Sequence, residues 1–336
     1  MGPTPEPGQI RLWAYQALAH GGEGILFFRF MAAPFGMEQY WYGILDQDGK
    51  TRRRYAEVSR IGRELQRREH LFMNKTPSYE ALIVRDYENG WSHQIKHHTA
   101  GFDYEQLLYQ YYRGASRLGI MTAVGRGDYR RYKLVMMPAY NVVDQDELQR
   151  VTEFVRGGGT LLVTYRSGQR NRDNTMSTIP LPGAFWQLVG VEVEEFDASD
   201  KETHIRGLIS STAHVWRDVI RPLTAQVLSS YVDRYFKGAA AITVNDFGKG
   251  KVYYVGCDLD EEGLDDLLRL VARDTGVTMQ EEIDGVELIR RPDCTILLNH
   301  TDSYVQCFNR GITLEDGHVF DGRLAPYGVE ILQPEE

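Results

Sequence analysis

About seventy residues at the start of the chain carry a helix, a buried strand and a second helix, or one and a half βα units. Apolar side chains at the helical period predict a helix over Gln9–Gly22. They are Ile10, Trp13, Ala14, Ala17 and Leu18. Gly24–Phe30 is a nearly continuous apolar run, as expected of a parallel strand buried on both faces. A second helix is predicted from Arg52 to Arg68.

A closed barrel of eight βα units needs about 250 residues, so this stretch cannot close by itself. Barrel enzymes place their chemistry at the carboxyl ends of several different strands. Residues 1–72 are therefore expected to be the last βα units of an incomplete TIM-type barrel. These residues would contribute only a small part of an active site of that kind.

Composition and charge exclude several functional classes. The chain has 336 residues, 42% of them apolar and 25% charged, which is ordinary for a globular protein with two domains or more. Its net charge of −9 gives nucleic-acid binding no electrostatic support. The longest apolar runs are strand-sized and fall well short of the ~20 residues that a membrane span needs. Neither nucleic acid nor a membrane is therefore an expected partner.

Three cysteines, Cys257, Cys294 and Cys307, are too few and too scattered for a disulfide framework or a cysteine-based zinc site. The N-terminus shows no secretory signal. A reducing cytoplasm is the expected compartment.

The middle of the chain alternates strands with helices. Strands are predicted at Ala81–Val84, Leu134–Met137, Leu161–Val163 and Lys251–Gly256, and helices at Asp103–Leu118, Asp144–Val155 and Glu261–Asp274. This order predicts an α/β domain over 78–278, with an open, mostly parallel sheet and helices on both faces. Arg166–Lys237 is less regular, with weak strands around Val191 and Val227. Residues 283–336 carry short strands and predict a small antiparallel β domain.

Several segments together resemble one enzyme family. Pro7–Gly21 and Ile25–Phe30 resemble the end of the barrel in glycoside hydrolase family 42 β-galactosidases. The segments Tyr165–Gly168, Glu194–Phe196 and Phe247–Tyr254 resemble that family's trimerisation domain, and Leu297–Thr301 and Pro326–Val329 resemble its C-terminal β domain. The resemblance spans essentially the whole chain, in the order of the family.

The resemblance implies a catalytic barrel, a doubly wound trimerisation domain like flavodoxin or glutamine amidotransferase, and a small β domain. It also implies a homotrimer that hydrolyses terminal β-galactosides with retention, using two carboxyl groups at the ends of the fourth and seventh barrel strands. This chain is expected to begin after the seventh strand. Both catalytic carboxylates are then expected on a missing N-terminal segment or a partner chain, and Glu6 matches only a linker position. No catalytic residue, cofactor or metal is assigned to this chain.

Glu38 is the leading candidate for substrate binding. It follows the last predicted strand, on the side where barrel active sites form. The segment Gly36–Trp41 resembles one whose glutamate and later histidine bind galactose hydroxyls, but Trp41 stands in the histidine's place. Tryptophan can stack on a sugar but cannot make both imidazole hydrogen bonds, so the sugar specificity is open. The alternative for Glu38 is a surface glutamate beside a packed aromatic ring.

Arg29 lies within the apolar strand, where a charge is costly unless it is paired. It is interpreted either as orienting a catalytic carboxylate or as pairing with a barrel glutamate, in both cases with a partner that this chain does not encode.

Two other patterns favour structural roles. His93, His97 and His98 have spacing that could suit zinc, but a loop at a subunit contact is the preferred interpretation. Gly157–Gly159 precedes a strand rather than opening a helix, so it is read as a turn and not as a phosphate-binding loop. Glutamine amidotransferases carry a nucleophilic cysteine at a strand-to-helix elbow. At the comparable place here, Thr164–Arg166 carries no cysteine, so this domain is not expected to catalyse a reaction.

Aromatic residues between Tyr87 and Tyr112 exceed what one helix–sheet contact requires, and a homotrimer contact would account for the excess. They are Tyr87, Trp91, Phe102, Tyr104, Tyr109, Tyr111 and Tyr112. Three hypotheses result. The chain is the C-terminal portion of a family-42-like glycosidase completed by a separate barrel chain, or it is a non-catalytic oligomerisation or sugar-binding module. A free-standing hydrolase that uses Glu38 is the third, but it needs a second carboxyl nearby, and the sequence offers no convincing one.

Overall fold

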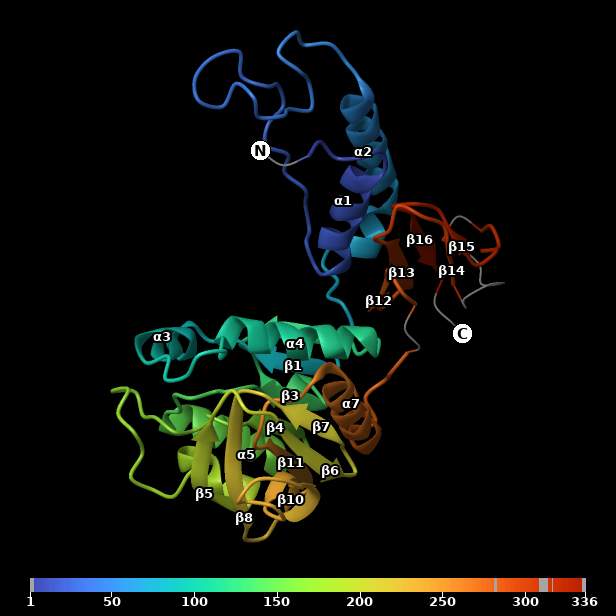
Figure 1. The fold of residues 1–336 in the computed structure, drawn as a ribbon. Helices are drawn as coiled ribbons and strands as arrows, with labels where there is room; N and C mark the ends of the chain where they lie inside the picture. The colour runs from blue at the N-terminus through green and yellow to red at the C-terminus, as the bar shows by residue number, and fades with distance from the viewer. Residues whose placement is uncertain (1–2, 281–282, 308–313, 316, 334–336) are drawn as a thin grey trace. The chain divides into compact units, whose positions relative to one another are not determined.

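The computed structural model describes residues 3–280, 283–307, 314–315 and 317–333 (Figure 1). The chain divides into two compact units. The first unit comprises Met1–Ser78 and Glu282–Glu336, and the second unit comprises Tyr79–Glu281. Residues 1–72 and 283–336, predicted as separate domains, thus belong to one compact unit.

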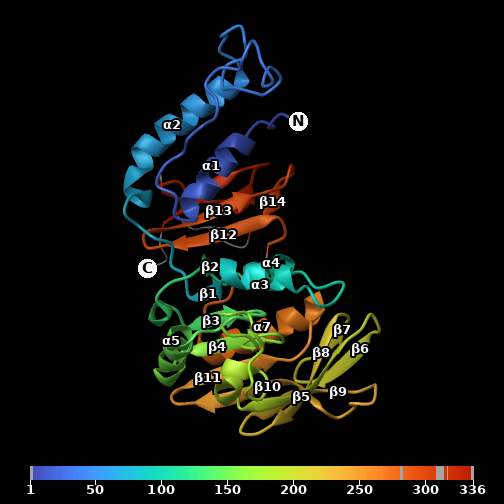
Figure 2. The same ribbon diagram turned by 90° about the vertical axis from the view of Figure 1, so that its left-hand side faces the viewer.

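The second unit is built on an 11-stranded mixed sheet. One half is parallel, in the order β2-β1-β3-β4-β11 (Figure 2). Its strands are β1 (Ala81–Val84), β2 (Thr122–Gly125), β3 (Leu134–Met137), β4 (Thr160–Thr164) and β11 (Gly250–Val255). Alternate residues of β1, β3, β4 and β11 enter two different apolar clusters, so both faces of the sheet are covered at these strands.

The other half of the sheet is antiparallel, so the expectation of a mostly parallel sheet was wrong. Its strands are β5 (Val191–Ala198), β6 (Thr203–Gly207), β7 (Ser211–Ala213), β8 (Trp216–Pro222), β9 (Gln226–Tyr231) and β10 (Ala240–Phe247). Most come from the segment that the sequence pattern presents as irregular. The cause is visible in β5, where only two of eight residues are buried, so its apolar signal is weak.

Three helices of the second unit form where the sequence predicts them, at 104–117, 145–156 and 261–275, whereas those at 87–95 and 186–189 were not predicted. The helices are α3 (Tyr87–Ile95), α4 (Tyr104–Arg117), α5 (Gln145–Arg156), α6 (Trp186–Val189) and α7 (Glu261–Thr275), with short 3-10 turns η1 (Tyr129–Arg131) and η2 (Gly183–Phe185). An aspartate caps four of them by accepting backbone N–H groups, namely Asp86, Asp103, Asp144 and Asp260. Helix α7 ends at Gly276, whose φ of 64° suits a residue without a Cβ.

Asp218 in β8 is a carboxyl group with no exposed surface. The Trp216 indole donates to it at 2.8 Å and the Tyr254 hydroxyl at 2.6 Å. Burial raises the pKa of Asp218 to about 7, although these hydrogen bonds and the charge of Arg166 act in the opposite direction. In the unfolded chain the same group titrates near pH 4. Between those two values the folded state holds a proton that the unfolded state has lost, so stability falls as the pH rises.

Asp218→Asn is therefore expected to make the free energy of unfolding decline less between pH 5 and pH 8. The amide can accept from Trp216 and donate to the Tyr254 hydroxyl, so the contacts survive without a titrating group. Urea unfolding at several pH values measures the difference. Asp246→Asn, at an exposed position of β10, is the matched control and should keep the parent pH profile. Identical profiles for Asp218→Asn and the parent would contradict the prediction.

In its described residues, the first unit contains two helices and two small antiparallel sheets (Figure 1). The helices are α1 (Gln9–Ala19) and α2 (Arg53–Phe72), which contact each other. The three-stranded sheet is β12 (Val286–Arg291), β13 (Cys294–Asn299) and β16 (Val329–Leu332); the two-stranded sheet is β14 (Val305–Gln306) and β15 (Arg323–Leu324). The small antiparallel sheets are thus confirmed, and none of the helices in the described ranges is long and apolar enough to cross a membrane.

Helix α1 buries a different stripe from the predicted one. Its buried residues are Leu12, Ala14, Tyr15, Leu18 and Ala19. Trp13 is 48% exposed, and Ala17 is exposed as well. The reason is that α1 packs on α2, β13 and β16, which select the face carrying Leu12 and Tyr15. The Trp13 face is left without a cover among the described residues.

The predicted strand Gly24–Phe30 is absent, which corrects the expectation of a strand buried on both faces. Leu26 is 97% exposed, and Phe28 and Phe30 are also exposed. Only a short pairing survives, in which the Leu45 N–H donates to the carbonyl of Phe30 at 2.7 Å. A buried parallel strand needs neighbouring strands to satisfy its backbone groups, and the described residues supply little more than this one bridge.

Polar side chains join the three-stranded sheet to the helices within the first unit. Arg291 of β12 is 5% exposed and donates to the carbonyls of Leu18, Ala19, Phe72 and Lys75. Glu287 of the same strand contacts Gln16, His20 and His300. Burial alone would raise the pKa of Glu287, but hydrogen bonds from His20 and His300 lower it to about 2.

Candidate functional site

The loop between Gly24 and Leu45 brings the three predicted sugar-binding residues together. The Arg29 guanidinium forms an ion pair with the Glu38 carboxylate. The Trp41 N–H donates to the carbonyl of Glu38 at 3.0 Å, and the Ile44 N–H donates to that of Arg29 at 2.8 Å. The loop therefore folds back on itself and holds both side chains near one turn. Arg29 was expected to need a partner from outside the chain, but its partner here is Glu38.

Aromatic rings complete this cluster. The Arg29 guanidinium lies 4.8 Å from the centroid of the Phe28 ring, over its face. The Phe28 and Trp41 rings meet edge to face, with centroids 6.5 Å apart. Trp41 is 51% exposed, so one surface of the indole remains open for stacking. A carboxylate oriented by an arginine beside an open indole can accept hydrogen bonds from hydroxyls and pack against an apolar sugar face.

The loop offers one carboxylate, whereas retaining glycoside hydrolysis uses two, about 5–5.5 Å apart. The next acidic residue along the segment, Asp46, forms ion pairs with Arg52 and Arg54 instead. Glu6, before α1, lies 3.3 Å from the Tyr327 hydroxyl of the β region and not in this loop. The described geometry therefore supports binding and orientation of a sugar, and it holds no pair of reacting carboxyls.

The same loop presents an unusually apolar surface. Its exposed large side chains are Leu26, Phe28, Phe30, Met31, Phe35, Met37, Tyr40, Trp41 and Tyr42. Exposed apolar residues that gather in one segment indicate an interaction surface, because such area is costly to leave in water. The sequence pattern missed this surface because it placed these residues in a buried strand and the turn after it.

The three histidines predicted near α3 do not form a set of metal ligands among the described residues. His93 lies inside α3, not in a loop as predicted; it is 2% exposed, with Nε2 2.8 Å from the carbonyl of Ala139. Burial lowers the pKa of His93 to about 4, so it is neutral near pH 7. His97 and His98 follow the helix. Among the described residues, no group of three or more acidic, histidine or cysteine side chains is placed to hold a metal ion.

Arg166 occupies the position of the nucleophile elbow after β4. Its φ of 60° is left-handed, which is unusual for a residue with a side chain. The guanidinium is buried and donates to the carbonyl of His97 at 3.2 Å, and it lies 4.2 Å from the ring centroid of Phe102. Burial lowers the pKa of Arg166 to about 10. The side chain thus anchors the loop after α3 to the end of β4, which is a structural role.

The aromatic residues between Tyr87 and Tyr112 divide into two groups. Phe102, Tyr104 and Tyr111 are buried in the core of the second unit, and Tyr112 is partly buried against the same core. Tyr87, Trp91 and Tyr109 are exposed, and the Tyr87 and Trp91 rings lie 6.2 Å apart. We call Tyr87 and Trp91 the aromatic patch. Core packing accounts for the first group, and the aromatic patch remains available for a contact with another molecule.

Comparison of the chain with known proteins identifies its family. A family model described as the β-galactosidase trimerisation domain matches residues 80–278, and one described as β-galactosidase matches residues 1–68. The β-galactosidase LacZ of Heyndrickxia coagulans is 31% identical over 97% of this chain and 51% of its own length. The β-galactosidase BgaA of Clostridium cellulovorans is 28% identical over 98% of this chain and 52% of its own.

Solved structures of β-galactosidases lead to the same family. The β-galactosidase of Bacillus circulans sp. alkalophilus superposes with a TM-score of 0.91 at 27% identity, covering 98% of this chain and 52% of that one. The β-galactosidase of the haloarchaeon Halorubrum lacusprofundi gives 0.88 at 28% identity, covering 99% and 51%. The chain spans about half the length of the relatives it matches. On these matches, the chain belongs to glycoside hydrolase family 42, the β-galactosidase family.

Proposed function

We propose that this chain acts as the C-terminal part of a retaining β-galactosidase. It supplies oligomerisation and one edge of the sugar pocket, and a barrel segment on the missing N-terminal side or on a partner chain supplies both catalytic carboxyls. The observation that carries the proposal is the end-to-end match to about half of each relative. The compartment we propose is a reducing cytoplasm, which suits three free, buried cysteines.

In this proposal residues 1–72 are the end of the barrel, 78–278 the doubly wound trimerisation domain, and 283–336 the C-terminal β domain. Glu38 accepts hydrogen bonds from sugar hydroxyls, Arg29 holds the Glu38 carboxylate in position, and Trp41 stacks on the sugar. The ion pair and the open indole support these roles. The exposed apolar loop supports the proposal that further barrel strands complete this part, because such strands would cover its apolar side chains.

We further propose that the chain assembles as a homotrimer, in which the aromatic patch takes part. Tyrosine and tryptophan are enriched in protein interfaces, and the family model of this region is described as a trimerisation domain. The proposed partner of the aromatic patch is a second copy of this chain.

Co-expression with a polypeptide carrying the first seven βα units of a relative is expected to produce hydrolysis of an aryl β-galactoside, which neither polypeptide shows alone. Phe30→Asp should prevent the association, because it places a charge in the apolar loop. Trp91→Ser, in the aromatic patch, is the control and should leave that association intact. Absence of any complex between the two polypeptides would reject a completing barrel chain.

The isolated chain and the barrel polypeptide also test the second candidate function, which is that of a non-catalytic sugar-binding module. The Arg29–Glu38 pair is already formed in the chain alone, which favours some binding without a partner. Calorimetry with galactose and the isolated chain is the measurement. Binding without the barrel polypeptide, together with no hydrolysis in its presence, would favour the module over the enzyme part.

A further inference from the structure

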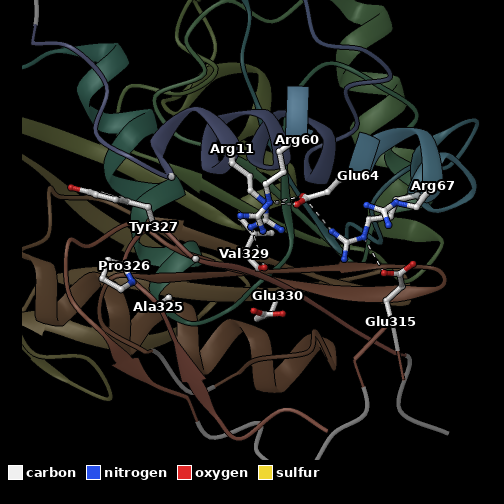
Figure 3. Close-up of a pocket in the computed structure, with 13 residues that line it drawn as sticks. Arg11, Arg60, Glu64, Arg67, Glu315, Ala325, Pro326, Tyr327, Val329 and Glu330 are labelled. Carbon is white, nitrogen blue, oxygen red and sulfur yellow. Dashed lines mark hydrogen bonds and ion pairs between the residues drawn. The ribbon is translucent and has the colours of Figure 1, made fainter. Parts of the chain in front are cut away.

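A cavity of about 610 Å³ in the first unit has an unusual concentration of arginine (Figure 3). Arg11 of α1 and Arg60, Arg67 and Arg68 of α2 line one side of it. The opposite side is the segment from Ala325 to Glu330, which runs into β16, together with Glu315. The cavity lies within one compact unit, and none of its lining residues belongs to the Arg29–Glu38 loop.

One buried carboxylate is shared among three of these arginines. Glu64 is 8% exposed and accepts from Nε of Arg11 at 2.8 Å and Nε of Arg60 at 2.7 Å. Nη1 of Arg68 lies 3.7 Å from the same carboxylate, and Nε of Arg68 donates to Glu315 at 2.9 Å. The Tyr15 hydroxyl adds a further hydrogen bond to Glu64 at 3.0 Å. Glu64 is therefore already paired with several donors, and other guanidinium N–H groups of the lining are left without a carboxylate.

Several guanidinium N–H groups remain unused. Arg60 engages Glu64 only through Nε, and Arg67 donates only to the backbone carbonyl of Arg63, at 3.2 Å. Both side chains are exposed at the mouth of the cavity, and neither terminal nitrogen of Arg60 or of Arg67 has a protein partner in the part of the chain that the structure describes. Four arginines face three carboxylates in the lining, counting Glu64, Glu315 and Glu330, so the formal balance is positive by one charge.

We propose that this cavity binds a multiply charged oxyanion, specifically a phosphate group, on the terminal guanidinium nitrogens of Arg60 and Arg67. Planar guanidinium forks match the spacing of phosphate oxygens, and such charge-assisted hydrogen bonds are the strong ones. A bound phosphate also faces the backbone of the 325–330 segment, so it ties α2 to the strand region across the cavity. The ligand is either free inorganic phosphate or the phosphate of a small organic ester, since both present the same oxygens.

Titration calorimetry on the full chain, with inorganic phosphate at constant ionic strength, tests the proposal. Arg67→Ala removes two unused terminal nitrogens without breaking a carboxylate pair, so its fold should be intact, and we expect it to weaken phosphate binding several-fold. Arg60→Ala/Arg67→Ala should weaken it about tenfold or more, because two charged donors are lost. Arg63→Ala/Arg206→Ala removes the same charge from exposed positions outside the cavity and should leave the affinity unchanged.

A parallel titration with glycerol 3-phosphate, an ester without the sugar that the Glu38 loop is proposed to bind, separates the two sources of the ligand. Tighter binding of the ester than of inorganic phosphate identifies an organic phosphate, and equal or weaker binding identifies the free anion. The proposal is overturned if millimolar phosphate produces no heat, or if the cavity variants and the surface control bind alike. These results are independent of hydrolysis, so they stand or fall separately from the proposed enzyme function.

Discussion

Replacing Arg291 with methionine is expected to release the carboxyl-terminal ends of α1 and α2 together. Nη1 of Arg291 donates to the carbonyls of Leu18 and Ala19 at 2.9 and 3.0 Å, and Nη2 donates to those of Phe72 and Lys75 at 3.3 and 2.6 Å. The last carbonyls of a helix lack partners within it, so one side chain of β12 here caps two helices. Its positive charge also lies at the negative ends of both helix dipoles.

Methionine fills a similar apolar volume but donates no hydrogen bond. Four carbonyls then lose a charged donor in a buried place, and we expect a loss of about 3–5 kcal/mol from the stability of the first unit. Hydrogen exchange measured by mass spectrometry should show faster exchange in peptides from 9–20 and 53–72. Peptides from β3 and β4, in the second unit, should keep their protection.

Arg63→Ala is the matched control, because Arg63 is an exposed arginine of α2 outside the cap. It should change the exchange of these peptides little. Unchanged protection of both helices in Arg291→Met would contradict the capping role, and loss of protection in α2 alone would confine it to one helix.

In the reconstituted enzyme, Glu38→Gln is expected to lower kcat/KM for an aryl β-galactoside about 100-fold. A hydrogen bond to a charged acceptor contributes about 1.5–3 kcal/mol, and each 1.36 kcal/mol is a factor of ten in rate. The amide still fits the turn, whose backbone bond from the Trp41 N–H does not involve the side chain. Steady-state kinetics on the complex, with kcat and KM resolved, is the measurement.

A fall in kcat that exceeds the rise in KM would place the Glu38 contact mainly in the transition state. Gln39→Ala is the control, since Gln39 is an exposed neighbour in the same turn. Retention of parental kcat/KM by Glu38→Gln in an active complex would remove Glu38 from the site.

Local signals allowed most helices and the parallel strands to be predicted from the sequence. Asp103 and Asp144 cap helices where expected, and Leu134–Met137 is buried throughout. The pattern failed where a structure depends on distant partners. Gly24–Phe30 has the composition of a buried strand, but strand formation requires neighbours to accept its backbone groups. The antiparallel strands were underestimated because their exposed faces are polar.

The residues of the candidate site were chosen from the sequence, and their role in sugar binding stays a prediction; their arrangement in space was not predicted. Glu38, Trp41 and Arg29 were selected from the resemblance and from a charge in an apolar run, and the structure brings them together in one loop. The ion pair between Arg29 and Glu38 depends on a chain reversal that no local propensity encodes. The arginine cavity had a visible signal, since Arg60, Glu64 and Arg68 recur at four-residue spacing on α2. Its other wall is more than two hundred residues away in sequence.

The cap that Arg291 places on α1 and α2 has a consequence for biosynthesis. The first unit is assembled from both ends of the sequence, and residues 79–281 lie between the two parts. A ribosome therefore delivers the whole second unit before it delivers the strand that completes the first. Until β12 emerges, the carboxyl-terminal ends of α1 and α2 lack the charged donor that Arg291 supplies to their carbonyls. This interval is when the nascent chain is most open to aggregation or to capture by a chaperone.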